Sequence, residues 1–202
     1  MPDSRFADLG VATTYEAAGR VGLVGEALVR LVPGARVAGR ARTALCGAGD
    51  NLAAHRLLEI VQPGEVVVLA VSAPSSAALV GELLVLQART RGAAALLVDG
   101  AVRDVDELLA LGLPVWARSV CAAGATKEAR GELDVPVSVG GVRVEPGDTV
   151  VLDGDGCVVV PAARRVEVLS AAEARQSFER ELAGRLEAGE VTMDAMGLRE
   201  AL

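Results

Sequence analysis

Three short apolar runs, separated by segments with helical spacing, constrain the fold of this chain most strongly. The runs lie at residues 63–73 (PGEVVVLAVSA), 93–100 (AAALLVDG) and 113–120 (LPVWARSV). Runs of Val, Leu and Ala without polar alternation are typical of parallel strands buried on both faces. Residues 79–92 and 104–112 have helical spacing and end at Gly92 and Gly112, where glycine commonly terminates a helix. The pattern predicts an α/β fold with β-α-β crossovers.

The segments before these runs continue the mixed pattern. Residues 12–31 carry apolar side chains at helical spacing, which we interpret as two helices interrupted by glycines, with Thr13 or Thr14 as an N-cap. Residues 36–45 alternate with period two, as in a strand, and residues 50–60 return to helical spacing behind an Asp-Asn start.

From residue 135 onward the chain changes to short β-rich pieces. Residues 135–161 contain four of them, separated by Gly-Gly, Pro-Gly-Asp and Asp-Gly turns, which predicts a β meander. Residues 162–190 then predict a long charged helix. No linker or low-complexity tract marks a domain boundary. We therefore expect one domain over residues 1–202, in which residues 162–202 are a helical extension that packs on a neighbouring subunit.

Composition and charge argue against several classes of protein. The formal net charge is −7 and the isoelectric point is about 4.9, which disfavours a broad basic surface for nucleic acid. Cys46, Cys121 and Cys157 are widely spaced, and with one histidine they form neither a disulfide framework nor a zinc set. The first residues lack a signal-peptide pattern, and no apolar run is long enough to cross a bilayer. We expect a cytoplasmic protein without nucleic-acid or membrane partners.

Arg103 and Asp104, which follow the second apolar run, are the main candidates for chemistry. Asp104 and Glu107 have the spacing of a capping box, in which both side chains bond amides at a helix start. A functional role is the alternative, because the carboxyl ends of strands gather ligand groups in α/β folds. An arginine there can hold a carboxylate or an enolate oxygen, and an aspartate can bind a hard divalent cation. The residues alone leave both interpretations open.

Other motifs carry weaker signals. Gly81 precedes a helix whose free amides could bind an anion, although helix packing is the simpler role for a glycine. His55 has apolar neighbours, so we interpret it as a packing residue. Residues 153–156 (DGDG) lack the acidic spacing of a calcium loop and indicate a hairpin turn. Residues 47–51 (GAGDN) lack the remaining glycine of a dinucleotide loop.

Taken together, residues 81–118 and 135–161 resemble the family of 4-hydroxy-4-methyl-2-oxoglutarate aldolases. That family also includes 4-carboxy-4-hydroxy-2-oxoadipate aldolases and the proteins called regulator of ribonuclease E activity A. The resemblance extends to residues 49–59 (GDNLAAHRLLE) and 186–200 (LEAGEVTMDAMGLRE). It implies a swivelling β/β/α domain that assembles as a homotrimer or a dimer of trimers, with active sites between subunits.

The resemblance also implies roles for individual residues. The segment that binds the pyruvyl end of the substrate corresponds to Gly81, Glu82, Leu83 and Leu84. Arg103 corresponds to an arginine that contacts the same group, and Asp104 to the ligand of Mg²⁺ or Mn²⁺. Glu179 corresponds to a glutamate that the C-terminal helix of the adjacent subunit contributes to the water shell of the metal.

These correspondences imply a metal-dependent retro-aldol cleavage of a 4-hydroxy-2-oxo acid to pyruvate and a second 2-oxo acid, with oxaloacetate decarboxylation as a side activity. Lys127, the only lysine, lacks the apolar sequence neighbours that activate Schiff-base lysines. Residues 70–76 (AVSAPSS) depart from the Gly-rich segment of many members, which leaves the pocket rim undefined. The alternative is a non-catalytic binding protein like the ribonuclease E regulators, although such members typically lack the aspartate that is Asp104 here.

Overall fold

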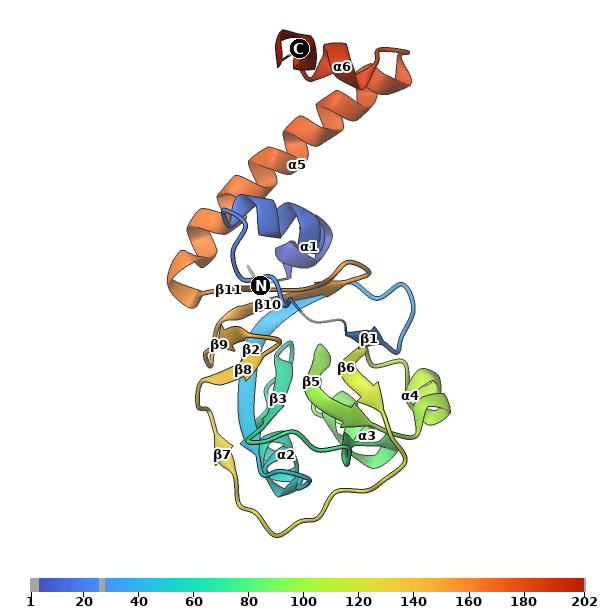
Figure 1. The fold of residues 1–202 in the computed structure, drawn as a ribbon, viewed down its shortest axis with the longest axis vertical. Coiled ribbons are helices and arrows are strands. Elements are labelled where there is room, and N and C mark those ends of the chain that lie inside the picture. The colour runs from blue at the N-terminus through green and yellow to red at the C-terminus, as the bar shows by residue number, and fades with distance from the viewer. Residues whose placement is uncertain (1–3, 26–27, 202) are drawn as a thin grey trace.

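A large curved sheet organises the protein in the computed structural model, which describes residues 4–25 and 28–201 (Figure 1). Its strands follow the order β1-β6-β5-β3-β2-β10-β11, with β4 beside β5 and β7 beside β2. Strands β2, β3, β5 and β6 are parallel, so the predicted β-α-β crossovers are confirmed. The strands are β1 (Val29–Arg30), β2 (Val37–Cys46), β3 (Val66–Val71), β4 (Ala78–Val80), β5 (Ala95–Val102), β6 (Val115–Val120), β7 (Glu132–Leu133), β10 (Thr149–Asp153) and β11 (Gly156–Val160).

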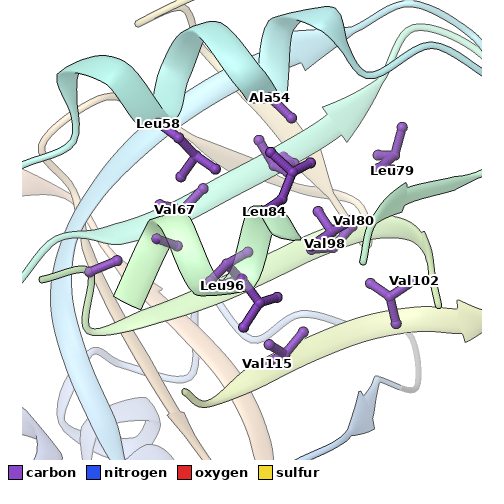
Figure 2. Close-up of a cluster of buried hydrophobic side chains, with 14 of the residues drawn as sticks. Ala54, Leu58, Val67, Leu79, Val80, Leu84, Leu96, Val98, Val102 and Val115 are labelled. Carbon is purple, nitrogen blue, oxygen red and sulfur yellow. The ribbon is translucent and has the colours of Figure 1, made fainter. Parts of the chain in front are cut away.

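Three crossover helices cover one face of the parallel strands. They are α2 (Leu52–Ile60), α3 (Glu82–Thr90) and α4 (Val105–Leu111). Their apolar sides pack on the strands in a buried cluster of Leu, Val and Ala that includes Leu58, Leu84 and Val98 (Figure 2). Burying a leucine of this kind contributes roughly 2 kcal/mol. Trp116 and other strand residues are buried on the opposite face, which explains why these strands read as continuous apolar runs.

Strand β2 joins two differently built parts of the sheet. Its second half begins at Ala41, which pairs in parallel with Val66 of β3, whereas Arg40 in its first half pairs antiparallel with Thr149 of β10. β10 and β11 form a hairpin, while β8 (Val137–Val139) and β9 (Val142–Val144) form a separate two-stranded sheet. The predicted meander is therefore present, but it is divided between two sheets.

The N-terminal helix and the beginning of the long C-terminal helix pack together on β10 and β11. α1 (Arg5–Ala17) and the beginning of α5 (Arg165–Glu187), which follows η1 (Ala162–Arg164), enclose an apolar cluster with these strands. Beyond this contact α5 projects from the body, followed by α6 (Thr192–Ala195) and η2 (Leu198–Ala201) (Figure 1). The predicted long charged helix is thus confirmed. None of the helices in the described part of the chain is both long and apolar enough to span a bilayer.

The prediction of two helices within residues 12–31 is wrong. α1 ends at Ala17, and the threonines predicted as caps lie inside it. Gly19 and Gly22 then take φ angles of 80° and 83°, through which a right-handed helix cannot continue. The chain runs on beside β11 and forms β1, while residues 26–27 lie outside the described residues. Val24 and Leu28, two of the apolar side chains that suggested a second helix, instead pack against strands.

Candidate functional site

A hollow of about 420 Å³ opens where β4 and β5 end and α3 and α4 begin. The carboxyl ends of parallel strands share one edge of a sheet, so the residues that follow them converge there. Residues from α2 and from the loop after β6 complete the wall. The predicted substrate segment 81–84 lies in this wall together with Arg103 and Asp104. The polar and charged lining residues are Asn51, His55, Glu82, Arg103, Asp104, Glu107 and Lys127.

Asp104 has a backbone conformation that separates its carboxylate from the helix that follows. Its φ of 59° and ψ of 46° are left-handed, a region that aspartate tolerates better than most residues. The side chain makes no capping hydrogen bond to α4; instead, Asp104 Oδ2 accepts a hydrogen bond from the Glu82 amide at 3.0 Å. The capping box with Glu107 is therefore not formed, and the carboxylate joins the start of α3 to the start of α4.

Arg103 lies against the same carboxylate and remains open to a ligand. Its Nε is 3.6 Å from Asp104 Oδ2, and the side chains of Arg103 and Asp104 are 46% and 38% exposed. Gly81 and Gly124 both leave room for the guanidinium: an added Cβ would lie 3.1 Å from Arg103 Nε at Gly81 and 2.9 Å from Arg103 Nη1 at Gly124. The backbone at Gly81 and at Gly124 therefore fixes the position of the guanidinium.

The start of α3 presents backbone donors beside Arg103. The Val85 amide donates to the Gly81 carbonyl at 3.1 Å, so the amides of Leu83 and Leu84 precede this hydrogen bond and have no acceptor one turn earlier within the helix. Such amides, together with the helix dipole, favour an anion. Leu84 is buried in the core, whereas the side chain of Leu83 is 77% exposed. The segment can therefore bind a carboxylate on a firmly anchored backbone.

Two residues of the hollow, His55 and Lys127, were not predicted from the sequence as part of a site. His55 is half-buried on α2, and Lys127 is exposed on the loop after β6. Burial and the nearby Lys127 charge lower the pKa of His55 below its ordinary value, so the imidazole is neutral at pH 7. An irregular loop has no periodicity to show which sheet edge it reaches. A lysine among glycine and alanine was the only available signal.

The segment 70–76, whose composition left the rim undefined, lies elsewhere. Residues 71–75 line a second hollow with Asp99 and Arg118, which form an ion pair. Residues 124, 125 and 127 of the loop after β6 border the hollow that contains Arg103. The rim of the candidate site is therefore built by this loop.

Glu179 lies apart from the hollow within the chain. It is on α5, where its Oε1 is 2.8 Å from Arg175 Nε and both side chains are exposed. Figure 1 shows α5 at the opposite end of the molecule from α3 and α4. Glu179 therefore does not reach the hollow of its own chain, and the role implied by the resemblance stays a prediction.

The oxygen ligands of the hollow suit a hard divalent cation. Glu82, Asp104 and Glu107 all line it. Within residues 4–25 and 28–201, no three His, Cys, Asp or Glu side chains are close enough together to hold a metal ion by themselves. Mg²⁺ is commonly bound through one or two carboxylates, with water and substrate as its remaining ligands. Asp104, which has one oxygen fixed by the Glu82 amide, fits such a ligand.

The fold and this hollow define an α/β protein of the crossover type, with an arginine and an aspartate set at the carboxyl ends of its strands. Residues 11–159 match the RraA-like family, described as Aldolase/RraA. The chain belongs to this family, which confirms the resemblance read from its motifs.

Some relatives are named as aldolases, and another is described as a member of a family of ribonuclease inhibitors. A protein of Halalkalibacterium halodurans, provisionally named 4-hydroxy-4-methyl-2-oxoglutarate aldolase, is 37% identical over 142 residues, or 70% of this chain and 68% of the relative. The 4-hydroxy-4-methyl-2-oxoglutarate aldolase of Thermus thermophilus is 37% identical over 127 residues, or 63% of this chain and 77% of the relative. The crystal structure of Streptomyces coelicolor RraAS2, described as an unusual member of the RNase ES inhibitor RraA protein family, has a TM-score of 0.78 at 31% identity and covers 87% of this chain and 92% of its own.

Proposed function

We propose that the protein is an aldolase that cleaves a 4-hydroxy-2-oxo acid to pyruvate and a second 2-oxo acid. The observation that carries the proposal is the placement of Arg103 and Asp104 beside the amides at the start of α3. The relatives named as aldolases of 4-hydroxy-4-methyl-2-oxoglutarate support that acid as a substrate. 4-Carboxy-4-hydroxy-2-oxoadipate, which has the same pyruvyl end, is a further candidate.

The residues of the hollow can divide the reaction between them. The amides of Leu83 and Leu84 bind the C1 carboxylate, and Arg103 donates hydrogen bonds to the C2 oxygen. When the C3–C4 bond breaks, its electron pair passes to the pyruvyl fragment, which becomes an enolate, and C4 becomes the ketone of the second 2-oxo acid. A water oriented by Glu82 and Asp104 takes the proton of the C4 hydroxyl, and protonation of C3 then gives pyruvate. Fixed donors on the C2 oxygen stabilise it most as its charge develops.

We propose Mg²⁺ or Mn²⁺ as the cofactor, with Asp104 as its ligand. Such a cation, when bound, supplies Lewis-acid polarisation of the substrate's carboxylate and ketone. Asp104 is already oriented for this by its left-handed backbone and its hydrogen bond from Glu82. Loss of CO₂ from oxaloacetate leaves the same pyruvate enolate, so we also propose oxaloacetate decarboxylation as a side activity.

Pyruvate release, coupled to lactate dehydrogenase, tests the proposal. 4-Hydroxy-4-methyl-2-oxoglutarate and oxaloacetate are each supplied with Mg²⁺ and then with excess EDTA. We expect release from both acids that EDTA abolishes and added Mg²⁺ restores. A folded protein that releases pyruvate from neither acid would favour the alternative, a non-catalytic binding protein like the RNase ES inhibitors among its relatives.

Lys127 raises a second mechanism, because it is an amine that lines the hollow. A Schiff-base aldolase forms an imine between lysine and the substrate ketone and needs no metal. Borohydride in the presence of pyruvate would reduce such an imine and inactivate the enzyme. Because Lys127 is exposed, it lacks the desolvating surround that activates such lysines. We expect that borohydride neither inactivates the protein nor raises its mass through pyruvate covalently attached to Lys127.

Gly81→Ala is expected to disable the site by crowding it. The φ of Gly81 is −141°, which any residue can adopt, but an added Cβ would lie 2.4 Å from Asp104 Oδ2 and 3.1 Å from Arg103 Cγ. The Arg103–Asp104 pair must move, so kcat/KM for pyruvate release should fall by about a hundredfold, the scale of an ångström-sized misplacement. Thermal unfolding should change little, because both displaced side chains are partly exposed. Full activity in a folded Gly81→Ala protein would contradict this geometry.

We propose that the chain forms one domain and assembles in the cytoplasm as a homotrimer or a dimer of trimers, in which the extension (residues 162–202) packs on a neighbouring subunit. Its outer part exposes Phe178, Val191 and Met196, which are each more than half exposed in the single chain. Covering them with another subunit would remove apolar surface from water. The arrangement would also bring Glu179 of one subunit to the hollow of the next.

Mixed oligomers test whether sites are shared. Glu179→Gln and Asp104→Asn are expected to be weakly active or inactive alone. Oligomers co-assembled from both variants should regain a measurable fraction of the activity, because some hollows then combine an intact Asp104 with an intact Glu179 from the neighbour. Arg175→Gln, which removes only the partner of Glu179 on α5, is the control and should stay active. Absence of recovery in oligomers shown by mass to contain both variants would contradict the shared site.

A further inference from the structure

We infer that Lys127 and His55 form a second anion-binding subsite, which holds the carboxylate at the far end of the substrate and so selects 2-oxo acids that carry two carboxylates. The inference rests on the proposed function for its substrate class. It adds a specificity role for two residues that the retro-aldol chemistry does not use.

Lys127 comes to the hollow from a different element than the carboxylates that line it. Glu82 lies on α3, Asp104 in the turn before α4 and Glu107 on α4, whereas Lys127 comes from the loop after β6. Although three carboxylates share the hollow with it, Lys127 makes no ion pair or side-chain hydrogen bond with any residue in the described ranges. Its ammonium group therefore keeps its donors for a ligand. An anion with a second carboxylate is complementary to such a position.

The loop that carries Lys127 is held in place by a buried carboxylate. Asp50 is 2% exposed, and its Oδ2 accepts hydrogen bonds from Thr126 Oγ1 and the Glu128 amide, both at 2.6 Å. These hydrogen bonds fix the residues on either side of Lys127. The Asn51 amide also donates to the Thr126 carbonyl at 3.0 Å. A lysine on a loop fixed from both sides loses less freedom on binding than one on a mobile loop.

The Asp50 carboxylate can hold the loop in this way at neutral pH. Burial raises its pKa, but hydrogen bonds from the Glu128 amide, the Thr126 hydroxyl and the Leu52 amide outweigh burial and hold the pKa well below its usual range. The carboxylate is therefore ionised at neutral pH, and it anchors α2 and the loop to each other. Because α2 carries His55, the same anchor fixes both members of the subsite.

His55 adds a neutral hydrogen-bonding group. Its lowered pKa makes the imidazole uncharged at pH 7, so it can donate one hydrogen bond without adding charge. A lysine ammonium beside a neutral imidazole is a sufficient set of donors for one carboxylate. The guanidinium of Arg103 remains for the pyruvyl end, and the two ends of a diacid are thus bound by different elements.

A matched pair of ligands tests the inference without requiring cleavage. 2-Oxoglutarate and 2-oxopentanoate have chains of equal length, and only the first has a carboxylate at the far end. With Mg²⁺ present, we expect calorimetry to show that the wild-type protein binds 2-oxoglutarate more tightly. Lys127→Met should lower the affinity for 2-oxoglutarate by about tenfold or more, the scale of a lost charge-assisted contact. Its affinity for 2-oxopentanoate should stay within about twofold of the wild-type value.

Two further variants separate this role from general effects of charge. Lys127→Arg keeps a cation and should retain most of the preference for 2-oxoglutarate. Arg130→Met removes a cation from the same exposed loop at a position outside the hollow, and should leave both affinities unchanged. Equal wild-type affinities for the two acids, or an unchanged preference in Lys127→Met, would overturn the subsite. Failure of the aldolase proposal has a different signature, because pyruvate release would then be absent from the wild-type protein.

Discussion

Replacement of Asp104 by alanine is expected to abolish Mg²⁺-dependent pyruvate release, with kcat/KM lower by about a thousandfold or more, because a cation that polarises the ketone supplies several kcal/mol of charge stabilisation. Asp104 is the carboxylate that the Glu82 amide orients at 3.0 Å. Titration of the protein with Mn²⁺, followed by electron paramagnetic resonance, should show that the variant has lost the site. This second readout does not depend on turnover.

The backbone at Asp104 requires a second variant. Its left-handed φ of 59° is costly for alanine, by about 1 kcal/mol, so Asp104→Ala alone could lose activity through misfolding. Asparagine tolerates this conformation, and its side-chain oxygen can still accept the hydrogen bond from the Glu82 amide. Asp104→Asn therefore removes only the charge. Asp106→Ala, an exposed carboxylate on α4 outside the hollow, is the matched control and should be fully active. Full metal-dependent activity in folded Asp104→Asn would refute the assignment.

Arg103→Met is expected to have the second-largest effect, a fall in kcat of about a hundred- to a thousandfold, as when one donor to a developing oxyanion is removed. Its effect should differ in kind from that of Asp104→Asn. Mn²⁺ should still bind, because the metal ligand is intact, whereas pyruvate binding should weaken. Arg103→Lys keeps the charge but not the fork of donors, so it should recover only part of the loss.

The position of Arg103 between two glycines makes this prediction specific. Gly81 and Gly124 approach the side chain from both sides, and the replacements Met and Lys are unbranched and no longer than arginine. Metal affinity, kcat and KM should each be measured for the wild-type protein and both variants. If Arg103→Met lowered only Mn²⁺ affinity, with kcat restored at high metal concentration, Arg103 would act by orienting Asp104 rather than by holding the substrate.

The parallel core could be predicted because its signals are local. Buried strands flanked by helices have continuous apolar runs, and Gly112, with a φ of 73°, ends α4 where the sequence places the stop. The error at residues 12–31 has the opposite origin. Apolar residues there match helical spacing, but their burial is decided by strands far along the chain, and the positive φ angles of Gly19 and Gly22 were not readable from spacing.

The candidate site was predictable in part for the same reason. Arg103 and Asp104 adjoin a strand end, so the general geometry of α/β sheets places them at the ligand-binding edge. Local spacing misled at Asp104, where a capping box was possible, because the hydrogen bond from Glu82 depends on the packing of α3 against α4. Lys127 reaches the hollow only because Asp50, distant in sequence, holds its loop. No pattern within either segment encodes that contact.

The division of β2 between two partners also bears on how the chain is made. Among the described strands, residues 37–40 of β2 pair with β10, and pairing with β3 begins only at Ala41. The ribosome synthesises β10 long after β2. Until then this half is an unpaired edge, open to the same half of another nascent chain. Folding must close a long loop before the sheet is complete, which slows it. Fragments that stop before β10 should therefore aggregate, and chaperone dependence should end once the β10–β11 hairpin emerges from the ribosome.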